Sequence, residues 1–419
     1  MKLDFPNVGE TLHHHVLDNG LSVYLLKKTG YEKTFATFTT KYGSIDRRFK
    51  LEDWIEVPDG IAHFLEHKMF EKEDGDVFQQ FGRQGASANA FTSFTRTAYL
   101  FGATSNVPEN VQTLLNFVQE PYFTKESVEK EKGIIGQEIQ MYQDNPGWRL
   151  YFGLIEAMYV THPVKIDIAG TIESISKITA EDLYTCHRAF YHPSNMALFV
   201  VGNIEPDEML ELIQSNQAAK SFDAPPLSAR ETIDEPATVR LSERVIEMDV
   251  SVPKVMIGYK DVPQAGEAGL KQELTVELLM HALFDTTAPL YTELYAEGLI
   301  DDAFSFDYTS EESFAFAALS METSQVDAFV ERVTSALERP LELNQETLDR
   351  KKRMMQGQFL KALNSPEFIA NQFSRYALND GNLFEIPNLI DAITLDELYE
   401  SYERLFRREQ RTVCVVKKP

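Results

Sequence analysis

The sequence predicts two domains of one α+β fold, each a mixed, largely antiparallel sheet packed with helices. Its 419 residues exceed what one ordinary hydrophobic core holds, so length alone favours two domains or more. Strand-like alternation and helical periodicity both recur along the chain. Residues 178–184 and 393–399 share Ile, Thr, Leu and Tyr at matching positions, offset by 215 (393 − 178 = 215). Because this offset is about half the chain length, it indicates a duplicated domain, with chance similarity as the alternative.

The two copies are separated by a proline-containing stretch. Each copy reads as a capped helix followed by an apolar strand, and the same offset aligns residues 198–201 with 413–416. Between the copies, Pro225, Pro226 and Pro236 break the periodicity, as expected of a linker. We therefore expect a first domain at residues 1–220, a linker at 221–237 and a second domain at 238–419.

The composition indicates an acidic protein without a membrane anchor. A net charge of −25 argues against nucleic acid or an anionic membrane surface as partner, and favours cationic partners if the charge lines a cleft. An ordinary acidic protein with a solvated surface is the alternative. The chain has no run of about 18–20 apolar residues and no apolar signal segment at its start, so we expect a cytoplasmic location. Two cysteines, Cys186 and Cys414, are too few for a disulfide framework or a cysteine metal site.

Strand patterns open the first domain. An Asn-Gly turn at 19–20 separates two of them, so we interpret the preceding histidines at 13–15 as ordinary strand sequence rather than a metal tract. Residues 34–40 alternate in the manner of a strand, and an acidic loop at 52–60 follows. Residues 86–101 are rich in threonine and aromatic residues and are interpreted as two strands near the helix that this loop precedes.

That helix, predicted at residues 60–70, contains His63, Glu66 and His67. Successive helical residues turn by about 100°, so the two imidazoles stand one turn apart with the carboxylate beside them. Two neutral imidazoles so placed can bind one Zn²⁺, while the carboxylate can take a proton from water. The pattern His-x-x-Glu-His is the inverted form of the commoner zinc-protease motif; a packed histidine pair on a core helix is the alternative. At the repeat offset the second domain has Leu278, His281 and Ala282 in these places, and it contains no rival motif.

A third metal ligand is expected on the helix predicted at residues 127–142. On a helical wheel, Glu131 and Glu138 fall in the middle of an apolar stripe that includes Ile134 and Ile135. Carboxylates on a core-facing stripe are costly unless they are paired, hydrogen-bonded or bound to metal. Two imidazoles leave a catalytic zinc one ligand short, so one glutamate can complete the site and the other can support it. Glutamates that meet Lys or Arg from a neighbouring helix are the alternative.

The histidine motif, the glutamate pair seven residues apart, the segment Ala-Asn-Ala-Phe-Thr at 88–92 and the two-fold repeat give the chain a family resemblance. Over essentially its whole length it resembles the pitrilysin/insulinase-type zinc metallopeptidases. It is most similar to the short members, which are related to the mitochondrial processing peptidase subunits. In those proteins each chain has two α/β domains, and two chains close into a clam-shell around a chamber.

The resemblance also assigns roles to individual residues. It implies that His63 and His67 bind one zinc ion per chain, with Glu138 as the third ligand. It implies that Glu66 is the general base that activates water and that Glu131 is a supporting carboxylate. The substrate backbone would be held in an extended form, as in strand addition, by the strand through Ala88, Asn89 and Ala90.

One part of the family pattern is missing from the second domain. Many relatives carry an Arg and a Tyr there, thought to hold the substrate carbonyl, near a Gly-Leu-x-Tyr segment. The comparable stretch at 293–302 has Tyr295 where the Arg is expected and an acidic residue where the Tyr is expected. This implies a zinc-bearing subunit whose homologous partner supplies the Arg/Tyr pair in a heterodimer, with a homodimer as the alternative. Arg375 and Tyr376, adjacent in sequence, are a second candidate for the pair.

The sequence therefore predicts a zinc-dependent endopeptidase or oligopeptidase that hydrolyses peptides or unfolded segments inside a dimeric chamber. The alternative is a non-catalytic peptide-binding or scaffold subunit of the same fold, because some relatives have become structural proteins. Those relatives usually lose the metal residues, whereas all five metal and carboxylate positions are present here. The substrate and the cleavage preference are not encoded in any motif that we find.

Overall fold

The computed structural model describes all 419 residues and divides them into two compact units. Unit 1 comprises Met1–Ile139, Asp167–Thr232 and Leu360–Phe384, and unit 2 comprises Gln140–Ile166, Ile233–Phe359 and Glu385–Pro419. The predicted domains at 1–220 and 238–419, with their linker at 221–237, follow the repeat in the sequence. The compact units follow packing instead, and each takes a segment from the other half of the chain.

Unit 1 is built on a seven-stranded sheet. In spatial order its strands are β1 (Lys2–Phe5), β2 (Glu10–Val16), β3 (Ser22–Lys27), β11 (Met196–Gly202), β4 (Thr34–Thr40), β10 (Thr97–Ala103) and β9 (Ala86–Thr92). Only β3 and β11 pair in parallel; the other neighbours are antiparallel. This confirms the predicted mixed, largely antiparallel sheet. Short strands lie outside it: β5 (Arg48–Lys50), β6 (Trp54–Glu56), β7 (Glu71–Lys72), β8 (Gly75–Asp76) and β12 (Ala229–Arg230).

The histidines at 13–15 lie in β2, so the interpretation as strand sequence is confirmed. The antiparallel pairing with β3 sets His14 opposite Tyr24. The two rings stack at a centroid distance of 4.3 Å. The side chain of His14 therefore packs on its neighbour in the sheet.

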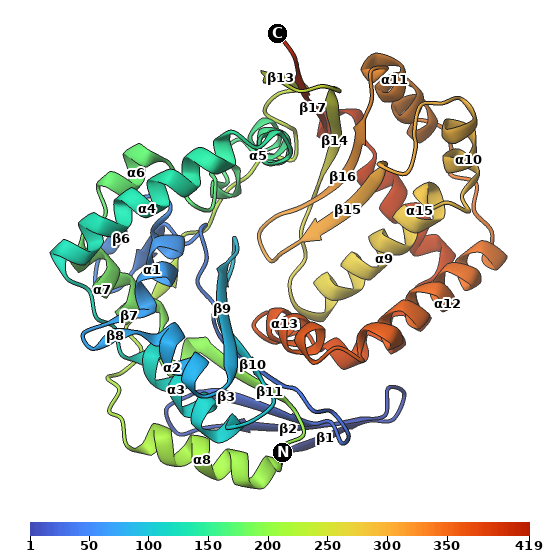
Figure 1. Cartoon of the computed structure of the whole chain (residues 1–419). Helices are drawn as coiled ribbons and strands as arrows, with labels where there is room; N and C mark the ends of the chain where they lie inside the picture. Colours follow the sequence, from blue (N-terminus) through green and yellow to red (C-terminus); the bar gives the residue numbers. More distant parts are fainter. The chain divides into compact units, whose positions relative to one another are not determined.

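Helices cover both faces of the sheet in unit 1, and one of them comes from the far end of the chain (Figure 1). The helices are α1 (Ile61–Met69), α2 (Val77–Arg83), α3 (Val107–Gln119), α4 (Lys125–Gln143), α6 (Ile172–Ser176), α7 (Ala180–Phe190), α8 (Pro206–Ala218) and α13 (Pro366–Ala377). α2, α3 and α8 lie on one face, and α13 lies on the opposite face against β4 and β11. Phe373 of α13 packs on Tyr24 and Phe199, with centroid distances of 4.9 and 4.7 Å.

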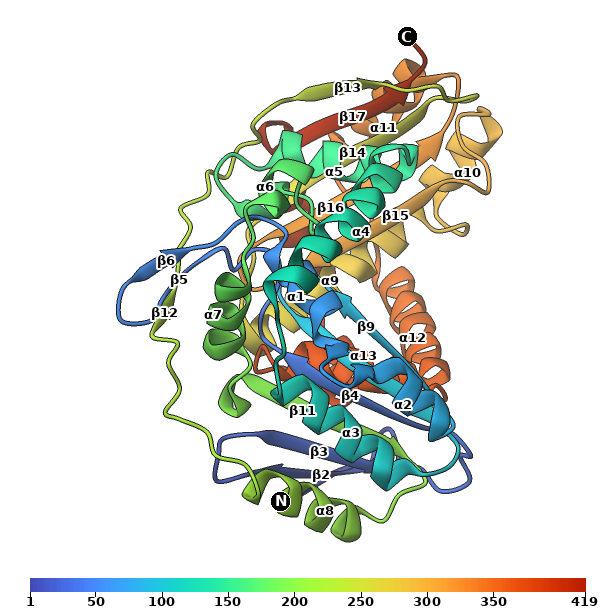
Figure 2. The ribbon, with the colours of Figure 1, turned by 60° about the vertical axis from the view of Figure 1, so that its left-hand side comes forward.

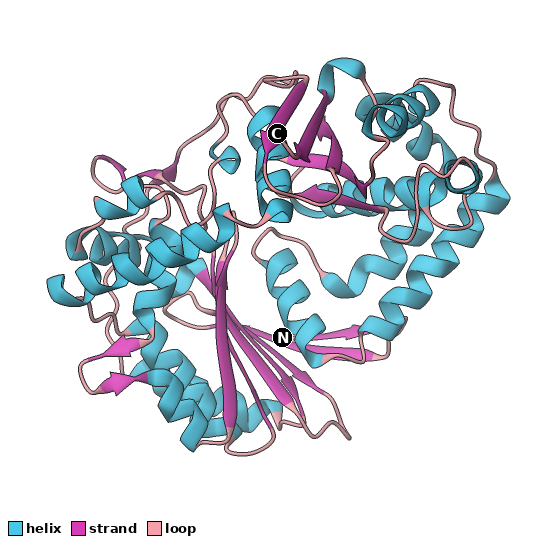
Figure 3. Cartoon of the chain, turned by 45° about the horizontal axis from the view of Figure 1, so that its top comes forward, coloured by secondary structure: helices cyan, strands magenta, loops and turns pink.

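Unit 2 repeats the arrangement of unit 1 with a five-stranded sheet. In spatial order its strands are β13 (Glu243–Glu247), β17 (Arg411–Lys417), β14 (Lys254–Asp261), β16 (Ala315–Glu322) and β15 (Ser305–Ser310). β13 and β17 are parallel and the other pairs antiparallel, which is the pattern of β3-β11-β4-β10-β9. Figure 3 shows the helices of the chain in cyan and its strands in magenta. The helices are α5 (Pro146–Met158), α9 (Gly266–Phe284), α10 (Pro289–Ala296), α11 (Val326–Leu337), α12 (Gln345–Ala362), α14 (Ile386–Ala392) and α15 (Leu395–Leu405).

The two halves of the sequence exchange one helix each. α5 belongs to the first half but packs on β13, β14 and β17 of unit 2 (Figure 2), whereas α13 belongs to the second half and packs in unit 1. Gly153 permits the close approach of α5, because a Cβ there would lie 2.7 Å from a side-chain carbon of Ile246 and 2.8 Å from the sulfur of Cys414. None of the helices in either unit is long and apolar enough to cross a bilayer.

The repeat at an offset of 215 is visible in the elements themselves. α7 and α15 have the same length, and so do β11 and β17, with starting residues 215 apart (395 − 180 and 411 − 196). Both helices begin with a capping box, formed by Thr179 with Asp182 and by Thr394 with Glu397. The duplication predicted from a short sequence match therefore extends to helix caps and strand order.

Glu235 fixes the loop that follows α5 within unit 2. Its carboxylate accepts hydrogen bonds from the backbone N–H groups of Val160, Thr161 and His162 at 2.7–2.8 Å. It also pairs with the ammonium group of Lys260, whose side chain is 4% exposed. One carboxylate therefore compensates a buried positive charge and three backbone donors.

We expect Glu235→Ala to destabilise unit 2 by about 3–5 kcal/mol, because the buried ammonium group of Lys260 then has no carboxylate partner and keeps only the carbonyls of Pro236 and Thr238. The matched control is Glu322→Ala, which breaks the ion pair of Lys254 with a half-exposed glutamate and should cost less than about 1 kcal/mol. Urea unfolding followed by hydrogen exchange of β14 amides measures both. Equal losses in the two variants would contradict this account.

The same carboxylate predicts a pH dependence. Burial acts to raise the pKa of Glu235, but the hydrogen bonds from Lys260 and Val160 outweigh it and lower the pKa from 4.5 to about 2. Because the pKa in the folded chain lies below that in the unfolded chain, the stabilisation is complete above about pH 5 and is lost as pH falls toward about 2. The stability difference between the wild type and Glu235→Ala should shrink over that interval.

Candidate metal centre

Helix α1 presents the motif residues from a fixed starting point, and the predicted helix at 60–70 is confirmed. Gly60 precedes the helix with φ 89°, in the left-handed region that favours glycine. A Cβ at Gly60 would lie 2.4 Å from the carbonyl oxygen of Ala169, so only glycine fits this turn. His63 and Glu66 are 9% and 8% exposed. The position of both side chains is therefore set by packing on nearly all sides.

Glu138 of α4 faces both imidazoles of α1. Its Oε1 is 3.7 Å from Nε2 of His63, and its Oε2 is 3.5 Å from Nε2 of His67. The three candidate ligand atoms lie within 4.8 Å of one another, and no other group of His, Cys, Asp or Glu in the chain forms such a cluster. Two imidazole nitrogens and a carboxylate oxygen are a donor set that catalytic zinc takes in proteins. The residues present therefore fit a metal ion.

The pKa values of the two imidazoles are shifted in opposite directions. Burial, and then the neighbouring His67, lower the pKa of His63 to about 4, so this ring is neutral at pH 7 and able to act as a ligand. Burial also acts to lower the pKa of His67, but its hydrogen bond with Glu131 and the charge of Glu66 raise it above the ordinary value. The carboxylates around the rings are the groups that a bound cation would balance.

Glu131 lies on the other side of His67 from Glu138. Its Oε1 is 3.2 Å from Nδ1 of His67, and its Oε2 is 3.9 Å from Nζ of Lys68. Metal-ligating histidines commonly donate their second N–H to a carboxylate, which fixes the ring. This geometry agrees with a supporting carboxylate. No role for Lys68 is predicted from the sequence, because its burial depends on the packing of α4.

The apolar stripe of α4 is narrower than predicted. Val128, Ile135 and Ile139 are buried, but Ile134 is 47% exposed, so its assignment to the stripe is wrong. The side chains of Glu131 and Glu138 are 12% and 22% exposed. Both glutamates therefore lie at the margin of the apolar stripe rather than in its middle. On the helical wheel, the three buried residues fall together on one side of the two glutamates.

Glu66 is held by a threonine from the sheet. Thr92 at the end of β9 donates a hydrogen bond from Oγ1 to Oε2 of Glu66 at 2.7 Å. Thr97, which is fully buried, pairs with Thr92 across the hairpin and donates to the carbonyl of Tyr42. Burial raises the pKa of Glu66 and the hydrogen bond from Thr92 opposes that shift. Threonine is ordinary in strands, so no sequence pattern predicts this contact.

The strand predicted to hold substrate is the edge strand of the sheet. β9 pairs with β10 on one side only, and α1 and α2 pack against it. Asn89 is exposed, whereas Ala88 and Ala90 are half-buried. The side-chain Oδ1 of Asn89 accepts a hydrogen bond from the backbone N–H of Ala90 at 2.9 Å. The N–H of Ala90 therefore bonds a side chain, and β9 presents an unpaired edge.

The stretch at 293–302 in unit 2 includes the end of α10. Tyr295 is 56% exposed and Asp301 and Asp302 are exposed. Arg375 and Tyr376 lie on α13 in unit 1, with the guanidinium 5.1 Å from the ring centroid. The structure therefore brings this Arg and Tyr next to each other, but on a helix that covers the sheet.

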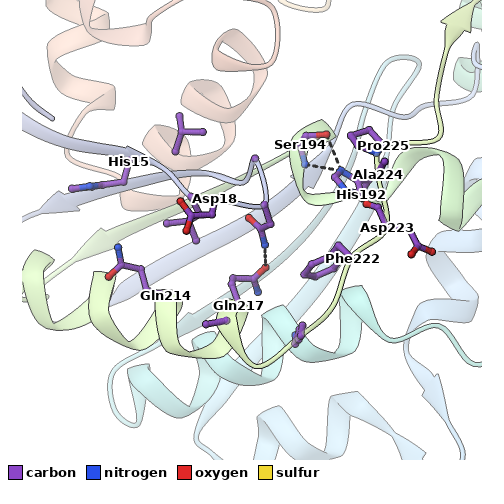
Figure 4. Close-up of a pocket in the computed structure, with 16 residues that line it drawn as sticks. His15, Asp18, His192, Ser194, Gln214, Gln217, Phe222, Asp223, Ala224 and Pro225 are labelled. Atoms are coloured by element: carbon purple, nitrogen blue, oxygen red, sulfur yellow. Dashed lines mark hydrogen bonds between the residues drawn. The ribbon is translucent and has the colours of Figure 1, made fainter.

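A separate cavity of about 780 Å³ lies in unit 1 (Figure 4). The turn after β2, the end of α8 and the segment after α8 line it. Asn19 donates to Oε1 of Gln217 at 2.9 Å, and His192 bonds the hydroxyl of Ser194 at 2.8 Å. No residue of its lining belongs to the metal cluster, so this cavity takes no part in the chemistry of that cluster.

Comparison with known sequences agrees with this geometry. Residues 56–172 match the family described as Insulinase (Peptidase family M16), and residues 177–355 match the family described as Peptidase M16 inactive domain. The chain is 52% identical over 422 residues to a Bacillus subtilis protein named uncharacterized zinc protease YmfH, covering 99% of this chain and 98% of that protein. The chain belongs to the M16 peptidase family.

Solved structures show the same fold. A crystal structure described as an M16-like peptidase from Alicyclobacillus acidocaldarius is similar with a TM-score of 0.95 and 37% identity, and the match covers 100% of both chains. A protease from Helicobacter pylori gives a TM-score of 0.82 at 20% identity, over 97% of this chain and 99% of that one. The second likeness is one of fold alone.

We expect the purified chain to bind about one zinc ion, and His67→Ala and Glu138→Ala to lose it, because each removes one of three ligands. The control is Glu129→Ala on the same helix, where the carboxylate pairs with Lys132 at 2.7 Å and is 59% exposed; it should keep its zinc. The metal content of the unmodified chain and of the three variants is measured after gel filtration. Zinc retained by His67→Ala and by Glu138→Ala would contradict the assignment.

Proposed function

We propose that this chain is a zinc-dependent endopeptidase or oligopeptidase that hydrolyses peptides or unfolded segments. The observation that carries the proposal is the convergence of Nε2 of His63, Nε2 of His67 and the carboxylate of Glu138, with Glu66 on the same helix as the two rings. The relatives named zinc proteases support it.

In this proposal His63, His67 and Glu138 hold the metal. Zinc, when bound, supplies a Lewis acid that polarises a peptide carbonyl and makes water more acidic. Glu66 takes the proton of the attacking water and later passes it to the leaving amine, which is general base and then general acid catalysis. The burial of Glu66 supports this role, because a raised pKa brings a carboxyl group closer to the range in which it can both accept and return a proton.

Thr92 gives Glu66 a single orientation. A general base has to lie within hydrogen-bond reach of the proton that it takes, so its position matters before its pKa. Oγ1 of Thr92 donates to Oε2 of Glu66 at 2.7 Å. The buried Thr97 pairs with Thr92 across the hairpin, and its hydroxyl lies 3.4 Å from that of Thr92. The base is therefore anchored to the same strand that we propose for substrate binding.

The free edge of β9 is the proposed substrate-binding element. A peptide in extended form can pair with an edge strand through backbone hydrogen bonds, independently of most side chains. Ala88, Asn89 and Ala90 would supply that edge, and Asn89 would release the N–H of Ala90 to the incoming strand. Because Thr92 follows on the same strand, a peptide bound there would run toward Glu66.

The other candidate is a non-catalytic peptide-binding or scaffold subunit. The family description of residues 177–355 as an inactive domain fits a second unit without a metal cluster, but it does not concern the cluster in unit 1. All ligands and the base are present there, so a peptidase accounts for more of the observed residues.

We expect Glu66→Gln to keep its zinc and to lose at least about a hundredfold in kcat, because the variant lacks the proton acceptor. The control is Glu73→Gln, in the exposed turn after α1, which should change neither property. Cleavage of a fluorogenic peptide library and metal content are measured on the same preparations. Cleavage by Glu66→Gln at the wild-type rate would exclude Glu66 as the base.

We further propose that two chains form the active chamber and that a homologous partner supplies the Arg/Tyr pair. The support is the composition of residues 293–302, where Tyr295, Asp301 and Asp302 offer no cation for a substrate carbonyl. An oxyanion that forms on the substrate has to be stabilised by a positively charged side chain or by a hydrogen-bond donor such as an N–H group. This chain has none at the expected position.

Co-purification from native cells should therefore yield a complex of this chain with a homologous chain, and the complex should cleave peptides at least about tenfold faster than this chain alone, because the partner adds the oxyanion donor. Mass analysis identifies the partner and a peptide assay compares the two preparations. Full activity of a homodimer of this chain would contradict the heterodimer and leave Arg375 and Tyr376 as the next residues to substitute.

A further inference from the structure

Lys68 is a fully buried lysine that directly follows His67. Its side chain has 0% exposure, although lysine is among the residues least often buried. Its Nζ pairs with Glu71 and lies 3.9 Å from Oε2 of Glu131. A buried ammonium group is strongly unfavourable unless carboxylates compensate it. Two carboxylates do so here, and one of them also contacts a candidate metal ligand.

Glu131 connects the lysine to the imidazole. Its Oε2 faces Nζ of Lys68, whereas its Oε1 faces Nδ1 of His67 at 3.2 Å. With Nδ1 held in this way, Nε2 of His67 is the nitrogen that faces Glu138, at 3.5 Å. Lys68 therefore contacts Glu131, and Glu131 contacts His67, which belongs to the metal cluster.

Pairing with Glu71 alone does not explain why Lys68 is buried. The side chain of Glu71 is 42% exposed, so a lysine on the surface could reach it without the cost of burial. The interior location is what brings the ammonium group near Glu131. On α4, the other lysines near Glu131 are Lys130, which is exposed, and Lys132, which pairs with Glu129.

We propose that Lys68 is a positioning residue of the metal centre, which holds Glu131 against Nδ1 of His67 and thereby strengthens zinc binding. The inference rests on the zinc site proposed above and adds to it a residue outside the ligands and the base. Lys68 touches neither metal nor substrate. It acts through Glu131, and this dependence makes the inference testable separately from the peptidase activity.

The test is a double-mutant cycle in zinc affinity, with Lys68→Met and Glu131→Gln alone and together in the full chain. Loss of a supporting group outside the ligand set costs about 10–100-fold in metal affinity, and we expect this loss in each single variant. If Lys68 acts through Glu131, the double variant should bind zinc no more than about threefold more weakly than Glu131→Gln, since contacting residues are non-additive. Competition with a chromogenic chelator measures the dissociation constants.

The matched control is Lys72→Met. Lys72 is a second lysine of the same segment, but its Nζ donates to the backbone carbonyls of Phe117 and Glu120 at the end of α3. Its loss should lower thermal stability and leave zinc affinity unchanged. Lys68→Gln, which retains a polar group, provides the measurement if Lys68→Met does not fold.

Two results would overturn the role of Lys68 while the zinc site stands. One is a Lys68 variant that binds zinc as tightly as the wild type. The other is a double variant whose loss of affinity is the product of the two single losses. A wild-type chain that binds no zinc, by contrast, would overturn the proposed metal site itself and the inference with it.

Discussion

The meeting of α4 with the imidazoles of α1 is the contact on which the chemistry of unit 1 depends. It brings Glu138 within 3.5–3.7 Å of Nε2 of His63 and His67, although Glu138 and His67 are 71 residues apart (138 − 67 = 71). Half-buried carboxylates need a positive partner. His63 does not supply one, because burial holds its ring neutral. His67 differs, because the carboxylates around it raise its pKa against the effect of burial. The packing of α1 against α4 therefore gathers carboxylates around the two imidazoles, an arrangement that a bound cation would balance.

The second copy of the fold shows what happens when this arrangement is absent. Unit 2 keeps the strand order of unit 1, but α9 has Leu278 and Ala282, both buried, at the positions that align with His63 and His67, and His281 at the position that aligns with Glu66. α12 begins 220 residues after α4 (345 − 125 = 220), so Lys351 lies as far from the start of α12 as Glu131 lies from the start of α4. Lys351 is 2% exposed and pairs with Asp285, just after α9. The buried charge between these two helices of unit 2 is therefore balanced by a side-chain ion pair.

Local sequence patterns predicted the elements well, but not the partners of those elements. The helix with His63 and His67, the strand at 34–40 and the two strands at 86–101 follow from periodicity, which depends on residues close in the chain. The exchange of α5 and α13 does not follow from periodicity. An apolar helix face shows that the helix packs on something, but it does not show which sheet the helix covers. The helical wheel failed at Ile134 for the same reason: the direction of the core is decided by a neighbouring element.

Lys68 shows why the surroundings of a site are harder to infer than its ligands. The two histidine ligands are spaced one helical turn apart, and two histidines with a glutamate at this spacing are uncommon outside metal sites. Their pattern is therefore informative by itself. A lysine after the second histidine is unremarkable in sequence, because lysines on helices are usually solvated. Its burial is tolerable only when Glu131 arrives from a helix more than sixty residues later (131 − 68 = 63). A buried charge can therefore be recognised only together with its partner, and that partner belongs to the tertiary structure.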